Sequence, residues 1–200
     1  GPEELQLEPE FAVADGIISL RHAHEGAQER RTLRVIKQRG VGYLGGDHSF
    51  RIDHRGLQVF PRQEALTQAP SYSATQELLS SGVSDLDELL RGGLIRSSST
   101  LILGAPGIGK TVLALHFLAA GAAAGEAGLF ISFQENPEQL ALRASHFGLL
   151  DEVELESWRE MTLSLSPVEL DVDVAAAAIR EAVERRKVRR VVIDSVAELE

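Results

Sequence analysis

Short apolar runs recur along the second half of the chain at intervals that suit the strands of a sheet. Three of them are continuous stretches of aliphatic or aromatic residues, and a fourth alternates apolar with polar positions. Polar residues or glycines bound each run, as they do at the ends of strands. The strands predicted in this way cover residues 99–103, 128–133, 161–165 and 190–194.

Stretches with helical spacing separate these runs. Pro137 favours a helix start and Gly148 a helix stop. The predicted helices cover residues 110–124, 137–147 and 173–187. Strands that alternate with helices of this length predict an α/β fold, in which a parallel sheet carries helices on both faces.

The first sixty residues have a different pattern. Alternating segments predict a β-meander, with a hairpin turn at His54-Arg55-Gly56. Residues 61–77 are rich in Pro, Ser, Thr and Gln and are typical of a linker. We therefore predict a β-rich segment over 1–60, a linker over 61–77 and an α/β domain over 78–200. The predicted strands of the β-rich segment cover residues 15–20, 31–36, 50–53 and 57–60.

The segment from Gly104 to Thr111 fits the phosphate-binding pattern G-x-x-x-x-G-K-[ST] without a mismatch, between a predicted strand and a predicted helix. Its glycines let successive backbone N–H groups turn toward phosphate oxygens, and the helix start adds free amides. Lys110 would then lie against the β- and γ-phosphates, and the Thr111 hydroxyl would bind Mg²⁺. The alternative is an ordinary glycine turn. The predicted nucleotide-binding residues are Gly104, Ala105, Pro106, Gly107, Ile108, Gly109, Lys110, Thr111 and Val112.

A carboxylate follows the last predicted strand, where Arg189-Arg-Val-Val-Ile ends in Asp194. The carboxyl ends of parallel strands form the edge at which doubly wound sheets bind their ligands. Asp194 would bind Mg²⁺ there, directly or through water, beside Thr111. The alternative is an incidental acid in a turn.

Composition narrows the class of protein. Of the 200 residues, 44% are hydrophobic and 25% charged, which is typical of a globular chain. No apolar stretch reaches transmembrane length and the acidic N-terminus is unlike a signal peptide, so we expect a cytoplasmic protein without membrane contact. Cysteine is absent, which excludes disulfides. The net charge of −10 argues against nonspecific nucleic-acid binding, and the missing initial Met indicates a fragment, a processed chain or an expression product.

Several other residues are of types that bind metals or nucleic acids elsewhere, but the sequence does not support such a role for them here. His22 and His24 have a spacing that can chelate a metal on a strand, but no acid or cysteine cluster surrounds them in the sequence, so solvated side chains are expected. Packing or surface roles are expected for His116 and His146, and a solvated helix end for the basic run 185–190. Trp158 stands alone in the sequence and indicates no platform for stacking bases.

Taken together, these motifs resemble the KaiC family of RecA-superfamily ATPases. Four stretches carry the resemblance: the lead-in to the glycine loop at 81–94, the strand and acidic turn at 130–140, the strand at 189–195, and the segments 30–40, 50–52 and 56–61, which are similar to the closing strands of a KaiC-type domain. The resemblance covers nearly the whole chain except the linker. It implies a tandem protein, with the end of one repeat over 1–60 and a second RecA-like repeat that is cut short after its Mg²⁺-binding strand.

The resemblance also implies site residues. Gln134 occupies the position of the family's water-activating glutamate, and Glu135 matches the second acid of that pair. An amide cannot accept a proton as a carboxylate does, although glutamine can orient a water. Gln134, Glu135 and Lys110 are therefore the candidate catalytic residues. Lys37 and Arg39 match a K-x-R strand that reaches the nucleotide of a neighbouring subunit; otherwise they are exposed basic residues on an edge strand.

Three functions follow from this resemblance. The first is a Mg²⁺–ATP-dependent ATPase that assembles into a ring, such as a hexamer, hydrolyses ATP slowly and phosphorylates itself or a signalling partner. The second is a regulatory ATP-binding module in which Gln134 marks lost catalysis. The third is a RecA-like ATPase acting on DNA, against which the net charge of −10 counts.

Overall fold

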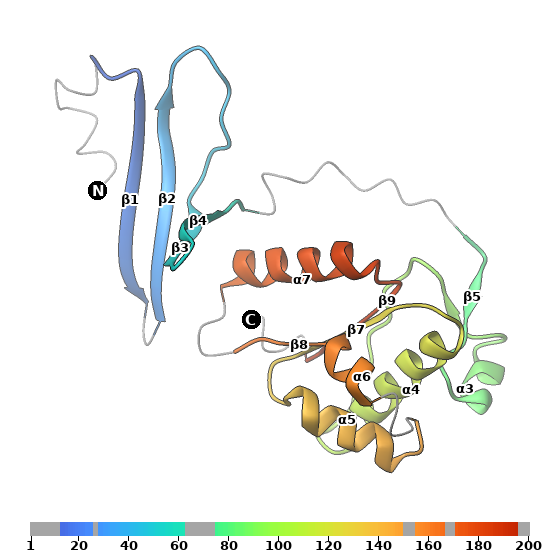
Figure 1. The fold of residues 1–200 in the computed structure, drawn as a ribbon. Coiled ribbons are helices and arrows are strands. Elements are labelled where there is room, and N and C mark those ends of the chain that lie inside the picture. Colours follow the sequence, from blue (N-terminus) through green and yellow to red (C-terminus); the bar gives the residue numbers. More distant parts are fainter. Residues whose placement is uncertain (1–12, 26–27, 63–74, 150–154, 167–170, 196–200) are drawn as a thin grey trace. The chain divides into compact units, whose positions relative to one another are not determined.

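The computed structural model describes residues 13–25, 28–62, 75–149, 155–166 and 171–195 (Figure 1). The chain divides into two compact units. The first comprises residues 1–69 together with 171–177, and the second comprises residues 70–170 together with 178–200.

The first unit contains a four-stranded antiparallel sheet in the order β1-β2-β3-β4, so the predicted meander is confirmed. Both strands of the first hairpin are longer than the sequence pattern predicts. Between β3 and β4, Asp53 pairs with Gly56 and His54-Arg55 form the predicted turn; Gly56 has φ of 96°, which glycine adopts without strain. The strands are β1 (Gly16–Glu25), β2 (Gln28–Gln38), β3 (His48–Asp53) and β4 (Gly56–Phe60).

An ion pair joins β2 to the segment before β3. Arg34 Nε donates a hydrogen bond to Asp47 Oδ1 at 2.7 Å. This hydrogen bond holds the pKa of Asp47 below its ordinary value. Three buried residues, His48, Ser49 and Phe50, follow at once and begin β3.

The second unit is built on a three-stranded parallel sheet in the order β8-β7-β9, which confirms an α/β fold with a parallel sheet. The strands are β7 (Gly128–Ser132), β8 (Thr162–Ser164) and β9 (Arg190–Asp194). The helices are α4 (Lys110–Ala123), α5 (Pro137–His146), α6 (Leu155–Met161) and α7 (Val172–Arg186), of which residues from 178 onward belong to this unit.

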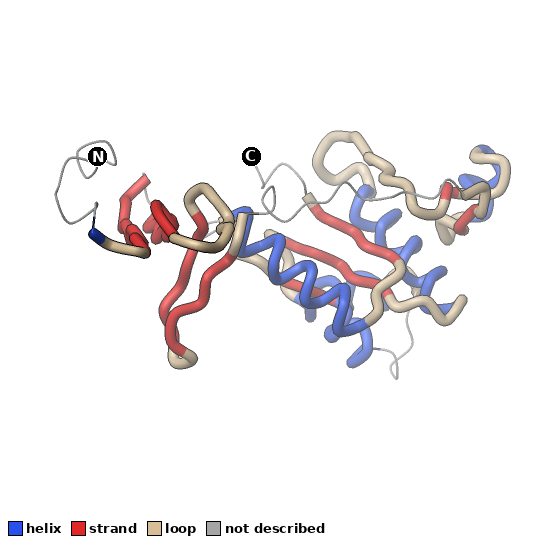
Figure 2. The backbone as a smooth tube through the Cα atoms, turned by 90° about the horizontal axis from the view of Figure 1, so that it is seen from above, coloured by secondary structure: helices blue, strands red, loops and turns tan. Residues whose placement is uncertain are grey.

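Helices cover both faces of this sheet, as predicted (Figure 2). Successive residues of β7 point to opposite faces, and all of β7 is buried. Phe130 contacts a cluster with Leu115 of α4, Leu140 of α5 and Trp158 of α6. Leu129, Ile131 and Phe133 contact the other cluster, which contains Ala182 and Ile179 of α7.

The predicted strand at 99–103 is wrong. These residues have no regular structure, and Leu101 and Leu103 are 70% and 81% exposed. An apolar run becomes a strand only where a neighbouring strand supplies hydrogen bonds. Among the described residues, 99–103 pairs with no strand: β9 is hydrogen-bonded to β7 alone and is the edge of the sheet.

Three short elements were not predicted. Strands β5 (Leu78–Leu79) and β6 (Leu94–Ile95) form a small antiparallel pair, and α3 (Ser84–Leu89) lies between them in the chain. The helix α6 was also missed. Among the described residues, no helix has the length and apolar character needed to cross a membrane.

Candidate functional site

The glycine loop ends at the first residue of α4, as the sequence predicts. Gly107 and Gly109 have φ of 79° and 106°, a region that glycine adopts without the strain of a side chain. Gly109 is the N-cap of α4, and no side chain caps this end. The first amides of α4 are therefore directed into the loop, which is the arrangement that binds anions at helix starts.

The ammonium group of Lys110 lies inside the same loop. Its Nζ donates hydrogen bonds to the carbonyl oxygens of Gly104 at 2.8 Å and Ala105 at 3.0 Å. The loop backbone thus curls around the cation. An anion that entered the loop would offer Lys110 a charged partner in place of two neutral ones, and charged partners form the stronger hydrogen bonds.

Thr111 and Asp194 meet at the carboxyl edge of the sheet. Thr111 is the second residue of α4, Asp194 is the last residue of β9, and the Thr111 hydroxyl donates to Asp194 Oδ2 at 2.6 Å. A hydroxyl and a carboxylate are the hard oxygen donors that Mg²⁺ prefers, and Mg²⁺ keeps several waters as its other ligands. The two residues predicted to bind Mg²⁺ therefore fit that ion by donor type and by proximity.

The carboxyl end of β7 carries the predicted catalytic pair. The Glu135 amide donates to Ser132 Oγ at 2.9 Å, which fixes the turn after β7. Arg143 Nη2 lies 2.8 Å from Glu135 Oε1, while Glu135 Oε2 is buried and accepts no hydrogen bond from the described residues. One oxygen of this carboxylate is thus held by Arg143, and the other is buried without a hydrogen bond from the described residues. Gln134 is exposed beside it.

The position of Arg143 follows from the local sequence of α5. Asn136 caps the helix by accepting a hydrogen bond from the Gln139 amide at 2.9 Å, and the Gln139 side chain accepts one from the Asn136 amide at 3.1 Å. Pro137 occupies the first turn, where its missing N–H costs nothing. This reciprocal cap fixes the start of α5, and Arg143 follows on the same helix.

These groups surround one cavity of about 360 Å³ in the second unit. Nine of the predicted residues line it: Pro106, Gly107, Gly109, Lys110, Thr111, Val112, Gln134, Glu135 and Asp194. Gly104, Ala105 and Ile108 belong to the loop but not to the lining. Sequence reasoning missed four lining residues, Ser132, Leu140, Arg143 and Ser195. The carboxyl ends of β7 and β9 could have indicated Ser132 and Ser195.

The lead-in to the loop is fixed against α4. Gly82 has φ of 83°, and a Cβ at this position would lie 2.2 Å from the carbonyl oxygen of His116, so only glycine fits. Asp87 accepts hydrogen bonds from the Ser80 hydroxyl at 2.6 Å and the Ser81 amide at 2.8 Å. Hydrogen bonds from Ser80 and then Ser81 hold the pKa of Asp87 below its ordinary value.

A buried charge network lies at the start of β9. The side chain of Arg190 is only 3% exposed. Its Nε donates a hydrogen bond to Glu126 Oε2 at 2.7 Å. Its Nη1 donates to the backbone carbonyls of Ser80 and Phe117, each at 2.8 Å. Arg96 donates to the other oxygen of Glu126. Arg96 and then Arg190 lower the pKa of Glu126. Since β9 also ends in Asp194, this network anchors the start of the strand that carries the predicted Mg²⁺ ligand.

The first unit holds Lys37 and Arg39. Lys37 lies on β2 and pairs with Ile17 of β1, and Arg39 Nη1 lies 3.1 Å from Asp15 Oδ1 in an exposed ion pair. β2 lies between β1 and β3 in the sheet, but β3 pairs only with Thr32 and Leu33, so the alternative that Lys37 and Arg39 are basic residues on an edge strand also stays a prediction. Their proposed contact with a neighbouring subunit's nucleotide stays a prediction.

Comparison with known proteins gives one consistent family. The model of the KaiC ATPase family matches residues 79–200. Over 189 residues, the chain is 33% identical to the circadian clock oscillator protein KaiC 1 of Synechocystis and 34% identical to the circadian clock oscillator protein KaiC of Thermostichus vulcanus. These matches cover 94% of this chain but only 36% and 35% of the relatives, so the chain spans about a third of their length.

Proposed function

Because the chain belongs to the KaiC family of ATPases, we propose that its second unit binds ATP with Mg²⁺ and hydrolyses the nucleotide slowly. The main support is the convergence of Lys110, Thr111 and Asp194 on one cavity, from two elements that lie far apart in the sequence. A phosphate chain needs backbone amides, a cation and oxygen ligands for its metal ion, and this cavity offers all three.

Each residue has a defined task in this proposal. The amides of the loop and of the α4 start bind phosphate oxygens, and Lys110 exchanges the Gly104 and Ala105 carbonyls for the β- and γ-phosphates. Thr111 and Asp194 would hold Mg²⁺. The ion, when bound, neutralises charge on the phosphates and orients the terminal group.

Glu135 is the candidate base for hydrolysis. Its Oε2 is buried without a hydrogen-bond partner among the described residues, while Arg143 fixes the other oxygen. A rotation of the side chain toward the cavity would let Oε2 accept a proton from a water there. Gln134 can orient that water but cannot take its proton. Only one carboxylate of the described cavity lining is proposed as the base, and one of its oxygens is in an ion pair with Arg143. Such a base is expected to give slow hydrolysis of ATP.

Ring assembly and phosphorylation extend the proposal to the full-length protein. Lys37 and Arg39 would be donated to the nucleotide of a neighbouring subunit, and the ring would be a hexamer with signalling partners. The relatives carry the name circadian clock oscillator protein, and a role of that kind for this chain, including kinase activity toward itself or a partner, rests on the resemblance alone.

A second candidate is a regulatory module that binds ATP without hydrolysing it. The observation that favours this alternative is the Glu135–Arg143 ion pair, which occupies a carboxylate oxygen next to an amide, Gln134, at the position of the usual base. A DNA-directed ATPase is disfavoured by the net charge of −10.

Calorimetric titration of the chain with ATP tests the binding step. We expect one ATP per chain in the presence of Mg²⁺ and weaker binding when EDTA removes the ion. No heat of binding from a folded chain in either condition would overturn the proposal. Binding without turnover in the full-length protein would favour the regulatory alternative.

A further inference from the structure

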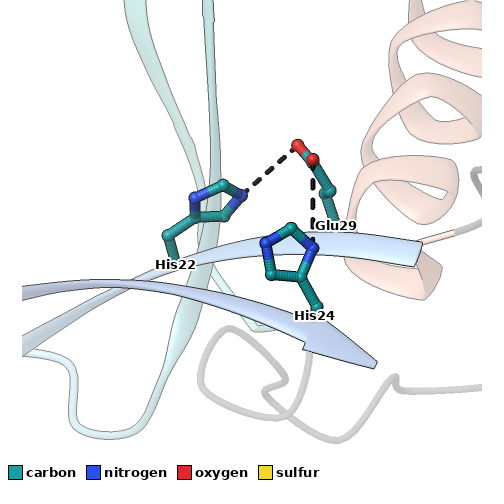
Figure 3. A group of neighbouring side chains, drawn as sticks. All are labelled: His22, His24 and Glu29. Carbon is teal, nitrogen blue, oxygen red and sulfur yellow. Dashed lines mark ion pairs between the residues drawn. The ribbon is translucent and has the colours of Figure 1, made fainter. Parts of the chain in front are cut away.

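The first hairpin brings together three metal-binding side chains that the sequence keeps apart. His22 and His24 lie two residues apart on β1, so their side chains share one face of the sheet. The strand register pairs His24 with Glu29 of β2, and His22 lies diagonally across from the same glutamate. Figure 3 shows both imidazoles directed toward the Glu29 carboxylate. The sequence shows no acid cluster around these exposed histidines, but the register of the hairpin brings one acid, Glu29, against both of them.

The distances suit a small metal ion. His22 Nε2 lies 3.3 Å from Glu29 Oε2, His24 Nδ1 lies 3.9 Å from Glu29 Oε1, and the two ring centroids are 5.1 Å apart. One ligand atom from each residue lies within 4.8 Å of the other two. Tetrahedral Zn²⁺ with ligands at about 2.1 Å separates those ligands by about 3.4 Å. The pair His22–Glu29 already has this spacing, and small rotations of the exposed His24 ring would supply the rest.

We propose that His22, His24 and Glu29 form a Zn²⁺ site at the end of the β1–β2 hairpin. Two imidazoles and one carboxylate, with a fourth position left to water, are a donor set that suits this borderline-soft ion. The same set is poorly suited to Mg²⁺, which prefers oxygen ligands. The site is therefore distinct in chemistry from the nucleotide site and would take a different cation.

Its surroundings predict the strength of the site. The three side chains are 44%, 68% and 61% exposed, so water and ion reach them freely. Arg31 pairs directly with His22 across the two strands, and its positive charge on the same face disfavours a cation. Neutralising Arg31 should therefore tighten the binding of Zn²⁺. The bound ion would also join β1 to β2 and stabilise the hairpin, because a ligand of the folded state shifts the folding equilibrium.

Calorimetry with ZnCl₂ tests the site on the chain prepared without a polyhistidine tag. We expect one Zn²⁺ per chain, a raised Tm with Zn²⁺, and no displacement by excess Mg²⁺. Loss of a single second-shell contact commonly costs 10–100-fold in metal affinity, so H22A, H24A and E29Q, which remove a ligand itself, should each weaken binding by at least about that factor. R31Q should strengthen it.

The matched control is H54A, because His54 is an exposed histidine in the β3–β4 turn and outside the cluster. It should leave Zn²⁺ affinity unchanged. The side chains of His22, His24, Glu29 and His54 are exposed and that of Arg31 is half-buried, and circular dichroism verifies that each variant folds. Stoichiometry below one in the wild type, unchanged affinity in H22A, H24A and E29Q, or an equal loss in H54A would overturn the proposal.

Discussion

The hydroxyl of Thr111 donates a 2.6 Å hydrogen bond to Asp194 across 83 residues of sequence. One partner is the second residue of the helix α4 after the glycine loop, and the other is the last residue of the strand β9. This contact joins the two parts of the chain that the proposed nucleotide site needs, and it places side by side two hard oxygen donors of the kind that Mg²⁺ prefers.

Replacing Thr111 should separate metal binding from phosphate binding. T111V removes the hydroxyl and keeps the shape, so we expect Mg²⁺–ATP affinity to fall by about 10-fold, the scale of one hydrogen bond or ligand to a charged group. Affinity for ATP in EDTA should hardly change. T111S keeps the hydroxyl and is the control in the same calorimetric titration. Equal losses with and without Mg²⁺ would assign Thr111 a structural role instead.

Glu135 should control turnover rather than binding. E135Q keeps the shape of the side chain but removes the proton acceptor, and general-base assistance contributes about 10²–10⁴-fold. We expect ATPase activity of the full-length protein to fall within that range while ATP affinity stays the same. E138Q, on the exposed first turn of α5, is the control. A variant with wild-type turnover would exclude Glu135 as the base.

Replacing Gln134 with glutamate should raise the ATPase rate, whereas E135Q should lower it. Q134E places a second carboxylate beside the cavity, and the ATPase rate of the full-length protein should rise, by less than the 10²–10⁴-fold range if Gln134 already orients water. Phosphate release over time measures the rate. An unchanged or lower rate would contradict the idea that Gln134 limits turnover and would leave Glu135, or a residue outside this chain, as the only base.

Glu126 should set part of the acid stability of the second unit. Because Arg96 and Arg190 lower its pKa below the ordinary value of 4.5, its stabilisation is present above that pH and is lost as the pH falls through the folded-state value. E126Q leaves Arg190 buried without a charged partner, so the free energy of unfolding at neutral pH should fall by about 3–5 kcal/mol. In this variant the free energy of unfolding should also change less as the pH is lowered from neutral into the acid range.

The control for this network is Glu77, which pairs with Arg96 at 2.9 Å but is 58% exposed. Exposed pairs contribute less than about 1 kcal/mol, so E77Q should change the free energy of unfolding by no more than that. Urea unfolding across a range of pH measures both variants. Equal effects of E77Q and E126Q would contradict the buried role of the network.

Ring formation by the full-length protein tests the proposed role of Lys37 and Arg39 in the first unit. The full-length protein should sediment as a ring with Mg²⁺–ATP and less so without it, because ligand bound to the assembled state shifts the equilibrium. K37A combined with R39A should weaken this effect, while R55A, in an exposed hairpin turn, should not. A monomer under both conditions would discard the ring and the role of Lys37 and Arg39 together.

The parts of the site that were predicted from the sequence are those specified by local patterns. The glycine loop fixes the start of α4, and Asn136, Pro137 and Gln139 cap α5 with residues that lie within one turn. The apolar run at 190–194 places Asp194 at the edge of the sheet because a parallel strand ends there. In each case the determining residues are neighbours in the chain.

The missed features depend on contacts between distant residues. Segment 99–103 has the apolar pattern of a strand but lacks a partner among the described strands. Glu126 meets Arg96 and Arg190 from 30 and 64 residues away, and no local pattern indicates that contact. Glu29 reaches His22 and His24 only through the register of the hairpin, which the sequence pattern leaves open.

The most direct test of the nucleotide site is the affinity of K110A for Mg²⁺–ATP, measured by calorimetry beside the wild type and K187A. Lys187 carries the same charge but follows α7 and lies outside the cavity. A hydrogen bond to a charged group contributes about 1.5–3 kcal/mol, so K110A should bind at least about 10-fold more weakly while K187A matches the wild type. Equal affinity of folded K110A and wild-type protein would contradict the assignment of this cavity to ATP.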